Sequence, residues 1–338
     1  MTHRNTPSRT ASQGRRRLLA MAASVMALAA VPASHVAAAE DWPNRPVTMI
    51  VPFAPGGPTD TTARVLGDAL SKMWNQTVVI ENRAGAGGTI GAATAAKAKP
   101  DGYTLVLGVT GSHGIAGSLY NNLPYDAAKD FEAIAKVVIY PNAIIANADS
   151  PAKNLQDLIE LAKSKPEYQV YGSDGNGTAS HLTMELLREK GGFQANVVQY
   201  KGASPLINDI VGGFVPYGIT GLPSAEAQIK AGKLKLIAIT TDQDYSGNGY
   251  PTISEQGFPG FVYAPWSGIF APKGTPAPIV EKIANDIKTA MSSTEVVDKM
   301  TALGLTPKPI ILGEFEADLE KERAAWAEAV KVSGAKLD

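Results

Sequence analysis

Short apolar runs alternate with helical patterns along most of this 338-residue chain. The run VTMIVPF at 47–53 predicts a buried strand, and apolar residues recurring every three or four positions predict a helix at 59–73. The same alternation predicts further strands at 77–81, 103–109, 168–172, 196–200, 215–220 and 234–240, and helices at 154–164, 178–190, 204–211, 222–231 and 312–333. We therefore expect an α/β fold with mainly parallel sheets that helices cover on both faces.

The first 39 residues have the composition of an export signal. Residues 1–17 carry five arginines and no acid, residues 18–33 are apolar and rich in alanine, and three alanines stand at 37–39. This order is typical of a cleaved secretory signal peptide. An uncleaved anchor is the alternative, but a membrane-spanning helix needs about 20 apolar residues. Because Arg15-Arg16 also resembles a twin-arginine signal, we expect export by the Sec or the twin-arginine route.

The remaining chain is acidic and contains no cysteine. Cleavage after Ala39 leaves 299 residues, with 26 basic residues against 32 acidic ones and a net charge of −6. That length predicts two domains. A mildly acidic, mixed surface argues against nucleic acid as a partner, which requires a basic patch. The absence of cysteine excludes thiol catalysis, thiolate metal sites and a lipoprotein anchor.

Two stretches are suited to crossing between domains. The first, at 137–153, is extended and contains Pro141; the second, at 259–276, is extended and rich in proline and glycine. The tail after it is helical, so we expect it to return to the first domain. The prediction is a discontinuous domain 1 at 40–141 plus 265–338, a domain 2 at 142–264, and a cleft between two lobes.

Three glycine-rich loops follow predicted strands, at 52–60, 109–114 and 171–181. In open α/β sheets, ligands bind at this end of the strands. Glycine exposes backbone N–H groups, and the start of the following helix adds a partial positive charge, so such loops can bind an anion without arginine. Ordinary strand-to-helix turns have a similar composition, but several such loops on one chain favour a binding site. Thr178 is the expected N-cap of the helix at 178–190.

Cofactor and enzyme motifs are weak. The loop at 82–93 has its glycines one residue off the dinucleotide-binding spacing, and the apolar Leu105 stands where the ribose-binding acid is required. No G-x-S-x-G motif occurs, and the S-x-x-K match at Ser150–Lys153 lies in a linker-like stretch without its partner motifs. His113 and His181 are the two histidines after the leader, and each fits a hydrogen-bonding cap better than a base. We expect no catalysis, no cofactor and no metal.

Several motifs together resemble a known family. WPNRPVTMIVPFAPGGPTDTTAR, ENRAGAGGTIGA, PDGYTL, LPYD, GNGTASH, YKGASP and LPSA…IKAGKLK occur in the order typical of Bug-type receptors, the extracytoplasmic solute-binding subunits of tripartite tricarboxylate transporters. The resemblance runs from Trp42 to near Val332. It implies a two-lobe, type II periplasmic-binding-protein-like fold that closes on a small organic carboxylate. It also implies a periplasmic protein, which we expect to be a monomer, that passes its cargo unchanged to membrane subunits.

The resemblance also implies where the ligand binds, through backbone amides, hydroxyls and bridging waters. One pincer loop matches 53–60, the other matches 173–181, and two further segments line the cleft. The residues carried over are Phe53, Ala54, Pro55, Gly56, Gly57, Thr59, Asp60, Thr110, Ser112, Ser173, Gly175, Gly177, Thr178, Ser180, His181, Tyr200, Lys201, Gly202 and Thr220.

Two departures from the family pattern affect the expected ligand. Many relatives carry an aromatic–acid pair ahead of LPSA, where this chain has Ile219 and Thr220. An acid there would hold a ligand amine, so its absence lowers the expectation of an amino acid. Asp174 adds a negative charge to the second pincer loop, where it either disfavours a polyanion or faces solvent. An exported hydrolase using His181 or His113, and a sensor accessory protein, are the alternative functions.

Overall fold

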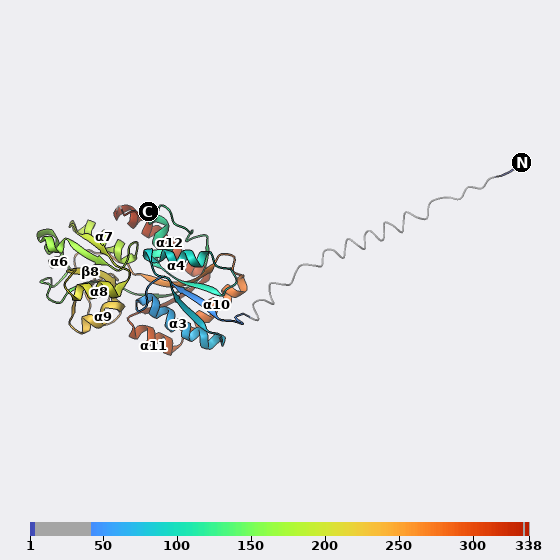
Figure 1. Cartoon of the computed structure of the whole chain (residues 1–338), viewed down its shortest axis with the longest axis horizontal. Coiled ribbons are helices and arrows are strands. Elements are labelled where there is room, and N and C mark those ends of the chain that lie inside the picture. The colour runs from blue at the N-terminus through green and yellow to red at the C-terminus, as the bar shows by residue number, and fades with distance from the viewer. Residues whose placement is uncertain (4–41, 334, 338) are drawn as a thin grey trace. The chain divides into compact units, whose positions relative to one another are not determined.

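A computed structural model describes residues 1–3, 42–333 and 335–337 (Figure 1). The predicted signal peptide at 1–39 lies outside the described residues, apart from its first three. The chain divides into one unit at Met1–Trp42 and a second at Pro43–Asp338, which contains every strand and helix described below. No helix among the described residues is long and apolar enough to cross a membrane.

Two sheets form the framework of the second unit. The first has six strands in the order β11-β4-β10-β3-β1-β2, and the second has five in the order β7-β6-β8-β5-β9. The strands of the first sheet are β1 (Val47–Val51), β2 (Val78–Asn82), β3 (Thr104–Val109), β4 (Phe131–Ile139), β10 (Trp266–Pro272) and β11 (Thr306–Ile311). Those of the second are β5 (Asn142–Asn147), β6 (Val170–Ser173), β7 (Asn196–Gln199), β8 (Tyr217–Gly221) and β9 (Leu234–Ile239).

The expectation of mainly parallel sheets is wrong, because both sheets are mixed. Strands connected through a helix within one lobe pair in parallel, as β1 does with β2 and β3, and as β6 does with β7 and β8. Every antiparallel pair contains β4, β5 or β10. These strands flank the two passages between sheets, where the chain enters a sheet without the helical crossover that a parallel neighbour requires.

The chain changes sheets twice. It leaves β4 at Ile139 and starts β5 at Asn142, and it leaves β9 at Ile239 and returns as β10 at Trp266. The first passage is therefore only two residues long. The first passage falls within the stretch 137–153, whose composition suggested a change of domain, and the second, at 240–265, ends within the other such stretch, 259–276.

Helices flank both sheets, and most of them lie where the apolar periodicity predicts. Against the first sheet pack α3, α4, α10, α11 and α12, and against the second α6, α7, α8 and α9 (Figure 1). Their bounds are α3 (Pro58–Trp74), α4 (Thr89–Ala96), α5 (Ala116–Leu119), α6 (Leu155–Ser164), α7 (Ala179–Gly191), α8 (Ala203–Val211), α9 (Leu222–Lys230), α10 (Ala277–Met291), α11 (Thr294–Ala302) and α12 (Leu312–Ser333).

The last helix contributes to the cores of both lobes. Phe315 and Leu319, near its start, are buried with Trp266 and Phe270 of the first sheet. Trp326 and two residues after it are instead buried in the cluster that contains β6, β8 and α7 of the second lobe. Helix α12 therefore packs against both lobes, although sequence composition placed the whole tail in the first.

The sequence patterns do not predict four of the strands as strands. β5 and β10 lie in the stretches 137–153 and 259–276, which were expected only to be extended, and β4 overlaps the first of these stretches at its end. β11 contains Pro307 and Pro309, which lower strand propensity, and it is tolerated because it lies at the edge of its sheet. β4 has the buried Lys136 in its middle, whose ammonium pairs with Asp318 of α12. The tertiary pairing with α12 compensates a charge that would otherwise interrupt a buried strand.

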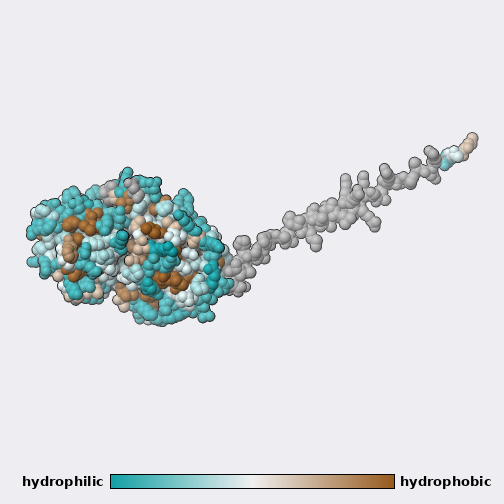
Figure 2. Space-filling view, viewed as in Figure 1, coloured by the Kyte–Doolittle hydropathy of each residue, from teal (hydrophilic) through white to brown (hydrophobic). Residues whose placement is uncertain are grey.

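The remaining apolar surface is divided among small areas. The face seen in Figure 2 is mostly hydrophilic, with apolar residues in several separate places. Phe214, 80% exposed in the turn before β8, is the most exposed large apolar side chain in the range 43–331. Scattered exposed apolar residues are normal on a folded protein.

Candidate ligand-binding site

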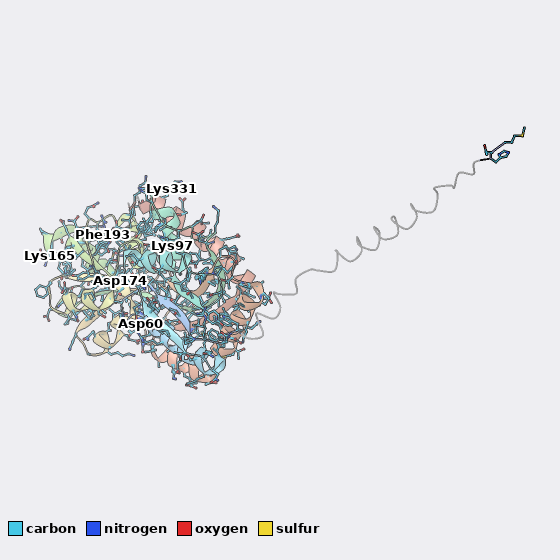
Figure 3. The ribbon with its side chains drawn as sticks, turned by 45° about the vertical axis from the view of Figure 1, so that its right-hand side comes forward. Asp60, Lys97, Lys165, Asp174, Phe193 and Lys331 are labelled. Carbon is cyan, nitrogen blue, oxygen red and sulfur yellow. The ribbon has the colours of Figure 1, made fainter. Side chains whose placement is uncertain are left out.

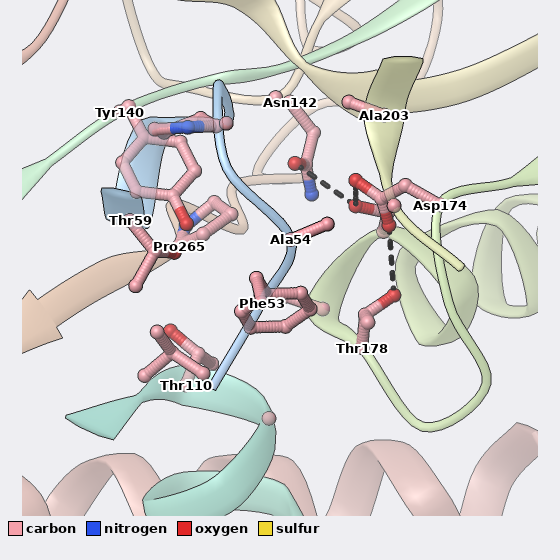
Figure 4. A pocket seen from close by; sticks show the side chains of 18 of the residues that line it. Phe53, Ala54, Thr59, Thr110, Tyr140, Asn142, Asp174, Thr178, Ala203 and Pro265 are labelled. Atoms are coloured by element: carbon pink, nitrogen blue, oxygen red, sulfur yellow. Dashed lines mark hydrogen bonds between the residues drawn. The ribbon is translucent and has the colours of Figure 1, made fainter. Parts of the chain in front are cut away.

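A cavity of about 120 Å³ lies where loops of both lobes and both sheet passages meet (Figure 4). The first lobe contributes Phe53, Ala54, Pro55, Gly57, Pro58, Thr59, Val109, Thr110 and Gly111, and the second contributes Asp174, Thr178, Ala179, Ser180, Gly202, Ala203, Ser204, Pro205 and Gly221; the passages add Tyr140, Asn142 and Pro265. A volume of this size fits a molecule with roughly the dimensions of benzene.

The start of α3 lines the cavity without a side-chain cap. Gly57 is the N-cap, and Pro58 is the first helical residue, so it has no N–H to satisfy. Gly56 has φ +93°, which explains its preference for glycine, whereas Gly57 has an ordinary extended conformation, with φ −87° and ψ 173°. A side chain at Gly57 would meet no atom within 4 Å. The glycine pair thus serves two purposes: Gly56 makes the turn, and Gly57 keeps the helix start open.

Asp60 belongs to this loop but does not line the cavity. Its carboxylate accepts hydrogen bonds from the backbone N–H of Gly56 at 3.0 Å, from Arg64 at 2.9 Å on both oxygens, and from Asn82 at 2.9 Å. Burial alone would raise the pKa of Asp60, but these bonds outweigh it, and the pKa lies below its usual value. Asp60 therefore fixes the loop as an ionised, fully paired group.

The segment after β3 is a π-helical turn, at Thr110–Ile115, rather than a plain loop. Thr110 lines the cavity, and its hydroxyl oxygen accepts the backbone N–H of Trp266 at 2.9 Å. Ser112 lies behind it, with its hydroxyl 2.8 Å from Nδ1 of His113. Burial, with a contribution from Arg323, lowers the pKa of His113 to about 3. His113 is thus a neutral core residue stacked on Phe270, and it is not placed to act as a base on a ligand.

Thr178 is the N-cap of α7, as its position predicted. Its hydroxyl oxygen accepts the backbone N–H of His181 at 3.2 Å, and Nδ1 of His181 accepts the backbone N–H of Gly177 at 3.3 Å. Burial lowers the pKa of His181. His181 therefore secures the loop as a neutral acceptor, while Thr178, Ala179 and Ser180 line the cavity.

The start of α8 forms another part of the second-lobe wall. Gly202 is its N-cap, with φ +126° and no side-chain cap, and the first turn of the helix lines the cavity. Tyr200 does not line the cavity, because its hydroxyl donates to Asp209 at 2.7 Å within the same lobe. Lys201 is exposed and is also absent from the lining.

Asp174 lines the cavity and is half-buried, so its carboxylate belongs to the wall of the site. The hydroxyl of Thr220 donates to its carboxylate at 2.8 Å. The hydroxyls of Ser180 and Thr178 lie 3.2 Å from the carboxylate (Figure 4). Each has a second acceptor within reach, which is Oδ1 of Asn142 for Ser180 and the carbonyl oxygen of Gly175 for Thr178. The backbone N–H of Gly221 donates to it as well. Burial raises the pKa of Asp174 above its usual value, and these hydrogen bonds oppose the rise without cancelling it.

The two sheet passages supply residues that sequence reasoning missed. Tyr140 and Asn142 flank the first passage, and Pro265 precedes β10. Burial and the nearby Asp174 raise the pKa of Tyr140, so it is neutral. Asn142 is 1% exposed, and its Oδ1 lies 3.2 Å from the hydroxyl oxygen of Ser180, whose single proton has both this Oδ1 and the carboxylate of Asp174 as acceptors. The Nδ2 atom of Asn142 has no hydrogen-bond partner among the described residues. No local sequence pattern marks these residues, because only the passage between lobes brings them to the cavity.

The predicted site residues divide into two groups. Nine line the cavity: Phe53, Ala54, Pro55, Gly57, Thr59, Thr110, Thr178, Ser180 and Gly202. The other ten lie behind or beside the lining: Gly56, Asp60, Ser112, Ser173, Gly175, Gly177, His181, Tyr200, Lys201 and Thr220. Some of the second group hold lining residues in place: the backbone N–H of His181 donates to Thr178, and the hydroxyl of Thr220 donates to Asp174, a lining residue outside the predicted set.

The lobes touch each other through glycines beside the cavity. A Cβ added to Gly87 would lie 2.5 Å from the carbonyl oxygen of Asn176, and one added to Gly111 would lie 3.3 Å from that of Gly177. Gly221 of the second lobe similarly faces Pro58 of the first. The two lobes therefore meet almost backbone to backbone, which encloses the cavity between them.

The architecture and motifs match one protein family. The family model described as "Tripartite tricarboxylate transporter family receptor" matches residues 62–310. The chain belongs to this family. The receptor is 36% identical to Protein BugT of Bordetella pertussis over 323 residues, which cover 95% of this chain and 98% of BugT.

Solved structures agree with this assignment. The R. palustris protein Rpa4515 with adipate has a TM-score of 0.84 and 34% identity, covering 88% of the receptor and 100% of the other chain. MatC from Rhodopseudomonas palustris with bound malate has a TM-score of 0.79 and 33% identity, covering 86% and 100%. The receptor thus has the two-lobe α/β fold of solute-binding proteins, and its family consists of receptors rather than enzymes.

Proposed function

We propose that this receptor captures a small organic carboxylate in the cavity and releases it unchanged to the membrane subunits of a tripartite tricarboxylate transporter. The observation that carries the proposal is the convergence of four helix starts on one cavity. The N-caps of α3, α7, α8 and α9, which are Gly57, Thr178, Gly202 and Gly221, all line it. Helix starts present free N–H groups and a partial positive charge, which favour an anion.

Neutral donors are sufficient for such a site. No lysine, arginine or histidine stands among the lining residues, all of which belong to the described range 53–265. Hydrogen bonds to a charged group contribute about 1.5–3 kcal/mol each, and micromolar binding requires about 8.2 kcal/mol. A few backbone N–H groups at the helix starts, together with the unpartnered Nδ2 of Asn142, can reach that value. The carboxylates bound by Rpa4515 and MatC support the same ligand class.

Release requires the lobes to separate, and the two passages that connect the sheets, at 140–141 and 240–265, suit that motion. The proposed bodies are 40–141 plus 265–338 and 142–264, with α12 in contact with both. We further propose that the mature protein is periplasmic, that cleavage removes 1–39, and that it acts as a monomer. Small-angle scattering with and without ligand should show a smaller radius of gyration when ligand is bound.

A thermal-shift screen over a carboxylate library tests the proposal, because binding to the native state raises apparent stability by mass action. We expect at least one small carboxylate to raise the melting temperature. Calorimetry should then give one site per chain, and mass spectrometry should recover the acid unaltered. Turnover of the acid, or stabilisation by neutral compounds alone, would contradict the proposal.

A further inference from the structure

Asp174 is the one carboxylate in the cavity wall, and it lacks a charged partner. Tyr140 is the other titratable lining residue, and it is neutral. The groups that donate to Asp174, namely three hydroxyls and one backbone N–H, carry no net charge. Asp60, which Figure 3 labels together with Asp174, differs because it is paired with Arg64.

An unpaired carboxylate in this position restricts what can bind. Burying an ionised group without a counter-charge is costly, and a second anion placed beside it adds repulsion that a low dielectric strengthens. Hydroxyls satisfy the hydrogen-bonding capacity of Asp174 but not its charge. A positively charged group on the ligand would both donate a hydrogen bond to Asp174 and compensate its charge. A ligand with such a group therefore removes the electrostatic cost of the unpaired carboxylate, whereas a simple polyanion would increase it.

We propose that Asp174 determines specificity, and that the ligand is a small acid that also carries an ammonium group, which lies against Asp174 while its carboxylate lies against the helix starts. The inference rests on the proposed function, since it requires the carboxylate to bind in this cavity. It reverses the expectation drawn from Thr220. No acid stands at the end of β8, but Asp174, directly after the neighbouring strand β6, places one beside it. The two positions meet because β6 pairs with β8, and the Thr220 hydroxyl donates to Asp174.

Asn142 gives independent support for a polar ligand at this wall. Its side-chain amide is linked to Asp174 through the shared hydroxyl of Ser180 (Figure 4). The Nδ2 atom is buried without a protein partner. Buried amide groups are rarely left unsatisfied in folded proteins. A small rotation of the buried Asn142 amide on binding would let a ligand carboxylate next to the ammonium group accept from Nδ2, as an amino acid with adjacent charged groups can do.

Paired acids that differ only by an amino group test the inference. Calorimetry on the full mature protein at pH 7 should compare succinate with aspartate, glutarate with glutamate, and adipate with 2-aminoadipate. We expect the amino member of the best-bound pair to bind at least tenfold more tightly. In Asp174→Asn this preference should fall at least tenfold, because the amide keeps the shape but loses the charge.

Two further variants separate charge from structure. Asp298→Asn removes one exposed carboxylate from α11 and should leave the preference unchanged. Asp174→Ser retains a small polar side chain and should lose the preference as Asp174→Asn does, which covers the case in which the asparagine variant fails to fold. If Asp174 only capped helix starts, both Asp174 variants would lower stability without changing the ratio of the two affinities, and the inference would be overturned.

The outcome also distinguishes the inference from the proposed function. If the unsubstituted acid of a pair binds as tightly as its amino partner or more tightly, the inference fails and the carboxylate receptor stands. If none of the six acids binds and none of the carboxylate library stabilises the protein, both fail.

Discussion

The two glycine loops that face each other across the cavity each contain one aspartate, buried in the first lobe and half-buried in the second, and the two aspartates differ in their partners. Asp60 in the first lobe accepts two hydrogen bonds from Arg64, and its pKa is lowered. Asp174 in the second lobe accepts hydroxyl and backbone N–H groups alone, and burial raises its pKa. Similar local sequence thus produces a structural carboxylate in one lobe and an uncompensated one in the other.

Asp60 has a charged partner and Asp174 has none among the described residues, and this difference separates the two roles. A paired carboxylate in a loop stabilises the fold and is unavailable to a ligand. An unpaired carboxylate in a cavity wall costs stability, and such costs are concentrated at functional sites. The predictions below test each half of this contrast.

The largest effect is expected from Asp60→Asn. It removes the ionic partner of Arg64 and the acceptor for the N–H of Gly56, and the free energy of unfolding should fall by about 2–3 kcal/mol. We expect the smaller loss within that range, because the Arg64 side chain is half exposed and stays solvated when its partner is removed. Asp174→Asn, the matched change, should leave stability unchanged or raise it. Urea denaturation of both variants measures the difference, and equal losses would remove the contrast.

The pH dependence of the same variants sharpens the contrast. Asp60 has a folded pKa below its unfolded value, so its stabilisation is present above about pH 4 and is lost as pH falls through the folded pKa. The gap between wild type and Asp60→Asn should therefore narrow below pH 4. Asp174 has a raised folded pKa, so its charge destabilises the fold at neutral pH, and any gain from Asp174→Asn should vanish on acidification.

The next largest effect is expected at the contact between lobes. A Cβ at Gly87 would collide with the carbonyl oxygen of Asn176, at a backbone φ of +62°. Gly87→Ala should therefore oppose closure and weaken ligand binding by about thirtyfold, close to 2 kcal/mol. Gly232→Ala is the control, since φ is +68° there and its Cβ meets no atom within 4 Å. If both variants lose the same affinity relative to wild type, backbone strain at a positive φ, rather than hindered closure of the lobes, is responsible for the loss.

A tenfold loss of affinity is expected from changes on either side of the cavity. Gly57→Val keeps an allowed backbone conformation and places its side chain in open space at the start of α3, so it should lower affinity by about 1.4 kcal/mol without unfolding the loop. Thr178→Val removes the cap of α7 and should cost a similar amount. Calorimetry gives the affinities, and melting temperatures show whether the fold is intact.

The smallest effect is expected from Lys201→Met. Lys201 is exposed and does not line the cavity, so its charge acts on the ligand only through solvent. Affinity should change less than about threefold, and the change should disappear in high salt. If Lys201→Met abolishes binding while Gly57→Val binds normally, the site depends on a cation and the glycine loop is merely a turn.

Local patterns in the sequence determined most of the elements. Helix α12 begins and ends where the apolar and charged pattern placed it, at 312 and 333, and α3 differs from its predicted bounds by one residue at each end. The cap at Thr178 was also readable, because capping depends on residues three positions apart. These features arise from hydrogen bonds and side-chain contacts within one or two turns, so they can be predicted from the local sequence.

Tertiary structure alone decided how those elements form the site. The mixed direction of the sheets and the position of Tyr140, Asn142 and Pro265 follow from where the chain passes between lobes. The bond between Thr220 and Asp174 joins residues 46 positions apart, because β6 and β8 are neighbours in one sheet. The sequence shows Thr220 where many relatives have an acid, and it shows an additional acid at Asp174. Only strand pairing brings the two positions together, since no local periodicity records which strands are adjacent.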